Sequence, residues 1–323
     1  MDGHLYPLKL HYITKTALWG GVKLKKEYGK NSEYDKVSES WELSVREGDT
    51  CLIENGPAAG MLLSDYFADY GNALVGKAYD GSRFPLLIKF IDARDCLSVQ
   101  VHPDDAYAFE NEKDPGKTEM WYVVEAEEGA ELIYGLRDGV TKADFVSAVD
   151  AGAYDSVMGR VPVKAGDVFF IPSGMLHAIG AGLLIAEIQQ NSDLTYRVYD
   201  FDRKGADGKL RPLHVDKAKA VTRPFSEQEI LAVRYARGLP EDENVLADCP
   251  YFRVTRCGEK NQTLNVTEES FLHLLCVDGE GVLLREKEKY PICKGEGYFL
   301  PAGMGEVTVM GDAVVLVSSA YFD

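Results

Sequence analysis

The sequence predicts a mainly β protein that contains two small β-barrels, with helices only in peripheral inserts and a metal site in the first barrel alone. Three observations lead to this fold class. Strand-like segments dominate the chain, helical patterns occur in few places, and one strand–turn–strand motif occurs twice. Short segments rich in β-branched and aromatic residues, separated by turn residues, are typical of β-sandwiches and β-barrels.

Six segments in the first two thirds of the chain have the composition of β-strands. They are rich in Val, Ile, Leu, Phe and Tyr, and most are bounded by Gly, Pro, Asp or Asn. The predicted strands cover residues 85–93, 96–102, 120–126, 131–136, 167–172 and 183–190.

Helical patterning is confined to three segments. Each of them opens near a capping residue or near a proline suited to the first turn of a helix. The predicted helices cover residues 62–79, 103–112 and 142–158. We expect them to lie at the periphery of the sheets.

An internal repeat indicates that the barrel is duplicated. Residues 164–177 and 294–306 both read Gly, five residues, Pro, any residue, Gly, two residues and a polar residue. The polar residue is His177 in the first copy and Glu306 in the second, and only the first copy is preceded by Gln-x-His. The alternative is that common turn signals recur by chance.

The duplication predicts two domains. Residues 1–237 form the catalytic domain with its helical inserts, and residues 238–323 form a degenerate barrel-like β domain without a metal site. The boundary is placed near residues 238–250, where proline and acidic residues cluster. A chain of 323 residues is long enough for one large or two modest domains.

Charge and composition exclude several classes of partner. The formal net charge of −17 opposes contact with nucleic acid or an anionic membrane. A few local cations or a metal can still bind a phosphorylated small molecule. The six cysteines are scattered, and the sequence shows no signal peptide and no apolar membrane span. We therefore expect a cytoplasmic protein.

Four residues form a candidate metal site. Gln100 and His102 are two apart on an extended segment, so their side chains leave the same face of a strand. Glu119 begins the next strand-like run, and we expect a neighbouring antiparallel strand to bring it opposite that pair. His177 follows a Pro-x-Gly turn. Two imidazoles, one carboxylate and one amide oxygen suit Zn²⁺, and a single anionic ligand leaves the metal Lewis acidic.

The same residues carry a resemblance to the cupin (jelly-roll) barrels. Residues 166–177 match the motif G-x5-P-x-G-x2-H of that fold, although Ala181 replaces the usual Asn four positions later. The first cupin motif usually begins with His where this chain has Gln100. Gln-x-His at this point is how the class I phosphomannose isomerases differ from other cupins. Further blocks resemble that family, namely residues 19–21, 39–44, 97–105, 116–124, 172–180 and 186–203.

The resemblance extends over most of the chain, and the short length is similar to the compact bacterial type. It implies the interconversion of mannose 6-phosphate and fructose 6-phosphate through an enediolate, with one Zn²⁺ per chain. It assigns the metal ligands to Gln100, His102, Glu119 and His177. Arg197 matches the active-site arginine of the family, and Lys117, Glu187 and Ser98 match pocket positions.

The substrate phosphate needs cations besides the metal, and the candidates are Arg197, Lys117 and Arg203. A surface ion pair is an equally good interpretation of Arg203. The proton-transferring base stays open between Glu187, His102 and a metal-bound water. Two other functions also stay open: a non-haem iron dioxygenase, because two His and a carboxylate also bind iron, and a non-catalytic sugar-phosphate sensor. The sequence predicts a small sugar phosphate as the partner and leaves the oligomeric state undefined.

Overall fold

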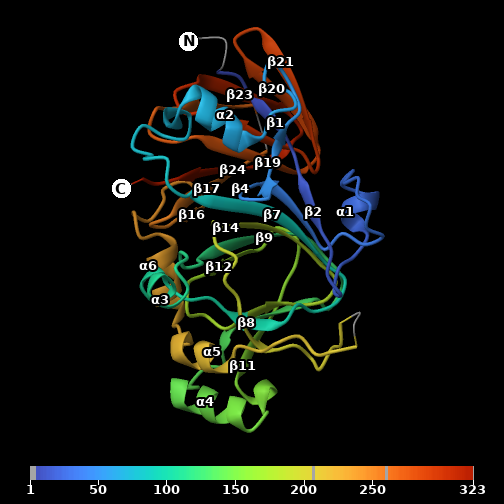
Figure 1. The fold of residues 1–323 in the computed structure, drawn as a ribbon, viewed down its shortest axis with the longest axis vertical. Coiled ribbons are helices and arrows are strands. Elements are labelled where there is room, and N and C mark those ends of the chain that lie inside the picture. The colour runs from blue at the N-terminus through green and yellow to red at the C-terminus, as the bar shows by residue number, and fades with distance from the viewer. Residues whose placement is uncertain (1–4, 206–207, 259–260, 323) are drawn as a thin grey trace.

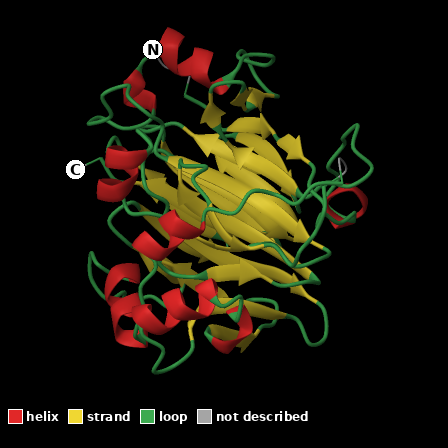
Figure 2. Cartoon of the chain, turned by 60° about the horizontal axis from the view of Figure 1, so that its bottom comes forward, coloured by secondary structure: helices red, strands yellow, loops and turns green. Residues whose placement is uncertain are grey.

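The structure is a computed structural model that describes residues 5–205, 208–258 and 261–322. Four large β-sheets are stacked along the long axis of the molecule, and the helices lie outside them (Figures 1 and 2). A small two-stranded sheet is formed by β4 (Val45–Arg46) and β5 (Asp49–Thr50). The prediction of a mainly β fold with peripheral helices is therefore confirmed. None of the helices in the described part of the chain is long and apolar enough to span a membrane. All six cysteines are unpaired.

A six-stranded and a five-stranded sheet form the lower half of Figure 1. The six-stranded sheet has the order β12 (Val168–Ile171), β9 (Glu119–Ala126), β14 (Leu183–Gln190), β7 (Leu86–Ala93), β3 (Glu39–Leu43) and β2 (Ile13–Lys15). The five-stranded sheet has the order β11 (Met158–Pro162), β10 (Glu131–Leu136), β13 (His177–Ile179), β8 (Val99–Val101) and β15 (Tyr196–Tyr199). Buried residues of both sheets pack together in one apolar cluster, among them Trp121, Ile185 and Ile179.

The upper half of the molecule is formed by a seven-stranded and a four-stranded sheet. The seven-stranded sheet has the order β16 (Val245–Asp248), β17 (Phe252–Cys257), β24 (Val314–Ala320), β19 (Leu272–Asp278), β22 (Gly297–Leu300), β1 (Leu8–His11) and β6 (Leu52–Ile53). The four-stranded sheet has the order β18 (Gln262–Val266), β23 (Gly305–Gly311), β20 (Glu280–Arg285) and β21 (Glu288–Cys293). A second apolar cluster fills the space between them, with Leu274 and Val317 on one side and Leu283 and Val307 on the other.

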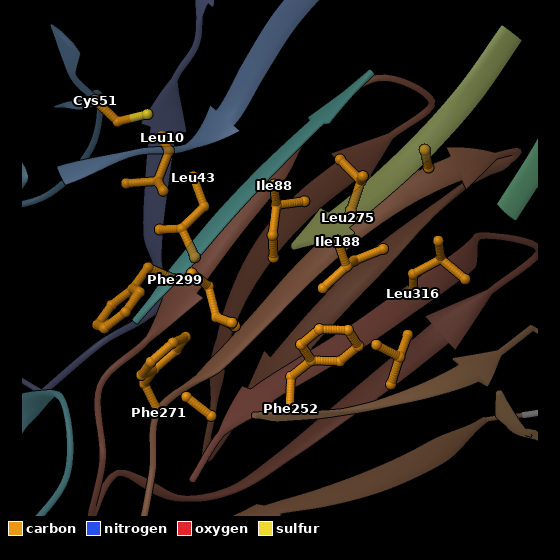
Figure 3. Packing of buried hydrophobic residues seen from close by; sticks show 14 of the residues in the cluster. Leu10, Leu43, Cys51, Ile88, Ile188, Phe252, Phe271, Leu275, Phe299 and Leu316 are labelled. Atoms are coloured by element: carbon orange, nitrogen blue, oxygen red, sulfur yellow. The ribbon is translucent and has the colours of Figure 1, made fainter. Parts of the chain in front are cut away.

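The largest apolar cluster joins the two halves of the molecule (Figure 3). Ile88 and Ile188, on β7 and β14 of the six-stranded sheet, lie beside Leu275, Phe299 and Leu316 of the seven-stranded sheet. These side chains are almost completely buried. The six-stranded sheet is therefore covered on both faces, which explains why every residue of β7 and of β14 is buried.

The N-terminal part of the chain contributes to the sheet formed mainly by the C-terminal part. Strand β1 pairs antiparallel with β22, so that Leu8 lies opposite Phe299, and β6 pairs with the other edge of β1. The predicted division at residue 237 stays a prediction, and this pairing adds residues 8–11 and 52–53 to the sheet of residues 245–320.

Helices occupy the three predicted segments, but all three are shorter than expected, and α2 and α4 end well before their predicted C-terminal ends. They are α2 (Leu63–Tyr70), α3 (Asp105–Asn111) and α4 (Lys142–Asp150). Gly71 after α2 has φ of 104°, and Gly152 after α4 has φ of 67°. Backbone in this conformation cannot continue a right-handed helix, so each predicted helix ends at its glycine.

Three further α-helices were not predicted, namely α1 (Lys23–Lys26), α5 (Val215–Val221) and α6 (Glu227–Arg234). A capping box between Ser226 and Glu229 opens α6, and this pattern is visible in the sequence. Helices α4 and α5 pack against the outer face of the five-stranded sheet, where Phe145 and Ala218 join its buried residues.

The two copies of the repeated motif share their backbone conformation. Gly166 and Gly295 have φ of 89° and 90°, and the later glycines, Gly174 and Gly303, have φ of 86° and 78°. A strand precedes and another follows the Pro-x-Gly turn in each copy. The backbone conformation matches at both glycine positions, so the repeat is structural as well as sequential.

Candidate metal centre

Three adjacent strands of the five-stranded sheet bring Gln100, His177 and Arg197 side by side. Gln100 on β8 lies opposite His177 on β13 and opposite Arg197 on β15. His102 follows the last residue of β8, two positions after Gln100, and Pro103 then ends the strand. The Pro-x-Gly turn between β12 and β13 places His177 at the first position of β13.

Glu119 reaches this group from the facing sheet, and not from a neighbouring strand as the sequence analysis predicted. It is the first residue of β9 in the six-stranded sheet, where it pairs with Ile171 and Gln189. The prediction was wrong because strand order in a sandwich is set by non-local pairing, which the spacing of residues along the chain does not show.

His102, Glu119 and His177 form a compact group, called the ligand cluster below. The two Nε2 atoms lie 3.1 Å apart, His177 Nε2 lies 3.3 Å from Glu119 Oε1, and His102 Nε2 lies 3.6 Å from Glu119 Oε2. In the described residues it is the one group of three or more His, Cys, Asp or Glu residues with metal-ligand geometry. The amide of Gln100 adjoins it, with Nε2 3.4 Å from His177 Nε2.

Backbone carbonyl groups orient both imidazoles. His102 Nδ1 lies 2.7 Å from the oxygen of Leu194, and His177 Nδ1 lies 2.8 Å from the oxygen of Met175. Because a carbonyl oxygen can only accept, each Nδ1 carries the proton and each Nε2 directs its lone pair into the ligand cluster. Burial lowers the pKa of both histidines, so the imidazoles are neutral at pH 7.

Glu119 is an ionised carboxylate without a hydrogen bond. Both of its oxygens are buried and lack a hydrogen-bond partner in the described chain, although Lys117 Nζ lies 3.0 Å from Oε2. Burial raises the pKa of this carboxyl, but nearby polar and charged groups, the Lys117 ammonium foremost, outweigh burial and lower the pKa to about 2. A site binds a divalent cation when its imidazoles are neutral and its carboxylate is ionised and free of hydrogen bonds, and the ligand cluster is in this state.

A cavity of about 330 Å³ opens beside the ligand cluster. Five of the predicted site residues line it, namely Ser98, Gln100, Lys117, Glu187 and Arg197. Arg203 lines a neighbouring cavity, where its guanidinium pairs with the Asp200 carboxylate and also bonds the carbonyl of Cys96. The sequence left Arg203 open between a phosphate-binding residue and a surface ion pair, and this geometry favours the ion pair.

The cavity also holds charged residues that the sequence analysis missed, among them Lys89, Glu39 and Arg211. Lys89 Nζ lies 2.9 Å from Glu187 Oε2 and 3.4 Å from Glu39 Oε2. Glu187 also accepts a hydrogen bond of 2.9 Å from Trp121 Nε1. Lys89 had one signal in the sequence, because it is a lone cation within the apolar run of β7. Arg211 lies in an irregular segment after β15, and no signal in the sequence marked it as a site residue.

The family relationship agrees with this site. Residues 7–137 match the family described as "Phosphomannose isomerase type I, catalytic domain", and residues 242–320 match "Mannose-6-phosphate isomerase, cupin domain". Mannose-6-phosphate isomerase ManA of Bacillus subtilis (strain 168) is 37% identical over 313 residues, which cover 97% of this chain and 98% of that protein. The chain belongs to the mannose-6-phosphate isomerase family.

Other members of the mannose-6-phosphate isomerase family extend this relationship. The mannose-6-phosphate isomerase of Streptococcus mutans serotype c is also 37% identical over 313 residues, with 97% of this chain and 98% of that protein covered. The crystal structure of the mannose 6-phosphate isomerase from Bacillus subtilis matches this fold with a TM-score of 0.86 and 33% identity, over 97% of this chain and 99% of that one. The family that the sequence motifs predicted is therefore confirmed.

Proposed function

We propose that this chain is a metal-dependent aldose–ketose isomerase that interconverts mannose 6-phosphate and fructose 6-phosphate. The observation that carries the proposal is the ligand cluster of two neutral imidazoles and a carboxylate that accepts no hydrogen bond, beside a cavity lined by Lys89, Lys117 and Arg197. Membership of the mannose-6-phosphate isomerase family supports the choice of substrate.

The proposed metal is Zn²⁺, one per chain, with Gln100, His102, Glu119 and His177 as ligands. The donor types and their number suit zinc, provided that the Gln100 amide presents its oxygen to the cluster. When bound, the ion supplies Lewis acidity for the oxygen on which negative charge develops. The backbone bonds from both Nδ1 atoms fix the imidazoles for this task, so the site is preorganised by the chain.

Three cavity residues are proposed to act on the substrate. The reaction moves a proton between C1 and C2 through an enediolate, and Arg197 is placed to stabilise the charge on its oxygen. We assign proton transfer to Glu187, whose Oε1 lies 4.0 Å from Nζ of Lys117. His102 is less suited, because Nδ1 is bonded to Leu194 and Nε2 is directed into the ligand cluster. Ser98 acts through Arg197, whose Nε donates to its Oγ over 3.3 Å.

The two-barrel arrangement is part of the same proposal. The six- and five-stranded sheets with the ligand cluster are assigned to a first cupin-like barrel, and the seven- and four-stranded sheets to a second, degenerate one. The second copy of the repeat has Glu306 on β23 where the first has His177. This substitution supports a metal site in the first barrel alone.

A coupled assay tests the proposal. The metal-loaded protein is expected to convert mannose 6-phosphate to fructose 6-phosphate, with no oxygen uptake. A loaded, folded protein without turnover would contradict the isomerase assignment and leave the sugar-phosphate sensor as the alternative. Oxygen uptake by an iron-loaded protein would instead favour the dioxygenase, which the family relationship does not favour.

A further inference from the structure

Two arginines, Arg203 and Arg211, pair with the buried carboxylate of Asp200, and Arg197 lies close enough to feel their charge. These three arginines are called the arginine cluster. Asp200 follows β15, and its side chain is 6% exposed. Arg211 binds it in a bidentate manner, with Nε 2.7 Å from Oδ2 and Nη2 2.5 Å from Oδ1. Arg203 Nη2 also lies 2.5 Å from Oδ1. A fork of two parallel bonds fixes the plane of the Arg211 guanidinium.

Some nitrogens of the three guanidinium groups already have hydrogen-bond partners within the protein, and others do not. All three of Arg203 have partners, since Nε and Nη2 bond to Asp200 and Nη1 bonds to the carbonyl of Cys96. Arg197 uses Nε for Ser98 and Nη1 for the carbonyl of Pro212. In the part of the chain that the structure describes, Nη2 of Arg197 and Nη1 of Arg211 have no hydrogen-bond partner. Arg197 and Arg211 line the cavity beside the ligand cluster, and Arg203 does not.

Charge is distributed unevenly along the cavity. Around the ligand cluster, two ammonium groups face the carboxylates of Glu39, Glu119, Glu187 and Asp193, which leaves a net charge of −2 that a divalent cation would neutralise. The arginine cluster holds three guanidinium groups and one carboxylate, that of Asp200, which pairs with Arg203 and Arg211, so its net charge is +2. A phosphate monoester carries nearly two negative charges at pH 7. The unneutralised positive charge thus matches it in sign and magnitude.

We propose that Arg211, held in place by Asp200, binds the phosphate group of the substrate, and that Arg197 adds its positive charge to the same end of the cavity while it acts on the enediolate oxygen. This inference rests on the proposed function, because it concerns the phosphate of the same sugar. It makes Arg211 a substrate-binding residue, and Asp200 and Arg203 positioning residues that act through it. The planar guanidinium is suited to phosphate oxygens, and its orientation is already fixed before the substrate arrives.

The test compares Arg211→Gln and Arg211→Lys with the wild type, all loaded with zinc. Arg211→Gln is expected to raise KM for mannose 6-phosphate about 10- to 100-fold, with little change in kcat, because it removes a charge-assisted hydrogen bond that persists throughout the reaction. Arg211→Lys is expected to restore part of the loss. Calorimetric titration with mannitol 6-phosphate, which has no carbonyl to isomerise, is expected to show the same loss of affinity.

Two controls complete the experiment. Arg253→Gln removes another arginine–aspartate pair, with Asp248 in the seven-stranded sheet, and is expected to change neither KM nor affinity. Asp200→Asn is expected to raise KM without abolishing kcat, and circular dichroism checks that it folds. Arg211→Gln with unchanged KM and unchanged affinity would overturn the inference while an active wild type upholds the proposed function.

An inactive wild type would refute the proposed function alone, since binding of mannitol 6-phosphate still tests Arg211. A wild type that neither turns over nor binds this ligand would overturn both.

Discussion

Glu119 is the residue whose environment constrains the site most strongly. Burying an ionised carboxylate is costly, and at Glu119 attraction to nearby charge, chiefly the Lys117 ammonium, offsets that cost in place of hydrogen bonds. A cation between the two Nε2 atoms and this carboxylate would offset more of it. Metal binding is therefore expected to stabilise the folded protein as well as to supply Lewis acidity.

His177→Ala is expected to lose the metal, because it removes one of two imidazoles and leaves Glu119 with fewer partners. Elemental analysis of the purified variant measures this directly. His11→Ala is a matched control, since His11 is on β1 in the other half of the molecule and pairs with Glu54. Retention of one metal per chain by His177→Ala would show that the ligand cluster is not the binding site.

Arg197→Ala is expected to keep the metal and lose turnover. Its guanidinium bonds to Ser98 and Pro212 and contacts no atom of the ligand cluster, so metal affinity does not depend on it. Elemental analysis combined with the coupled assay separates the two effects. A fully active Arg197→Ala protein would contradict the role in charge stabilisation.

Site residues that belong to a recognisable local motif could be predicted from the sequence. Site residues that reach the cavity only through pairing of distant strands could not. Gln100 and His102 share a strand face, and His177 follows a recognisable turn, so all three could be identified from spacing. Lys89 and Arg211 enter the cavity only because β7 and the segment after β15 converge there. That convergence depends on strand order, which one sequence does not encode locally.

At the scale of elements, the repeated motif offers a matched comparison of two glycines. Gly166 and Gly295 have nearly the same left-handed φ, but their surroundings differ. A Cβ at Gly166 meets nothing within 4 Å, whereas a Cβ at Gly295 would lie 2.6 Å from the carbonyl oxygen of Tyr28. At this first glycine, the second copy is thus packed against Tyr28, and the first copy is open.

Gly166→Ala is expected to lower the free energy of unfolding by about 1–2 kcal/mol, the cost of a Cβ in left-handed backbone. Gly295→Ala is expected to lower it further, because the same strain is combined with a backbone clash. Thermal and urea unfolding of both variants measures the difference. Equal destabilisation would show that the contact with Tyr28 relaxes freely.

The helix lengths show that apolar periodicity along the sequence does not predict where a helix ends. The apolar periodicity of residues 62–79 and 142–158 continues past Gly71 and Gly152, so the predictions extended too far. Both glycines were visible in the sequence as signals that end a helix. The Ser226 capping box likewise marked a helix that the prediction omitted.

At the scale of the whole molecule, the central apolar cluster makes the two halves interdependent. Side chains of β7 and β14 are buried by the seven-stranded sheet, and β1 is a strand of that sheet (Figure 3). The mainly β class was predictable from strand-like composition. The pairing of Leu8 with Phe299 was not, because nothing near either residue specifies so distant a partner.

A chain ending at residue 237 is expected not to fold as a stable monomer. Its six-stranded sheet would expose the apolar face that Leu275, Phe299 and Leu316 cover, and β1 would lose its partner β22. Circular dichroism, dye binding to exposed apolar surface and size-exclusion chromatography measure this. A monomeric fragment with a cooperative unfolding transition would show instead that the first 237 residues form an independent domain.

The most direct test of the central claim is a metal titration of the isomerase activity. Protein stripped with a chelator is expected to lose conversion of mannose 6-phosphate, and one equivalent of Zn²⁺ per chain is expected to restore it. His177→Ala is expected to recover no activity at that stoichiometry. Stripped protein that keeps the full wild-type rate would contradict the claim that His102, Glu119 and His177 hold a metal on which the reaction depends.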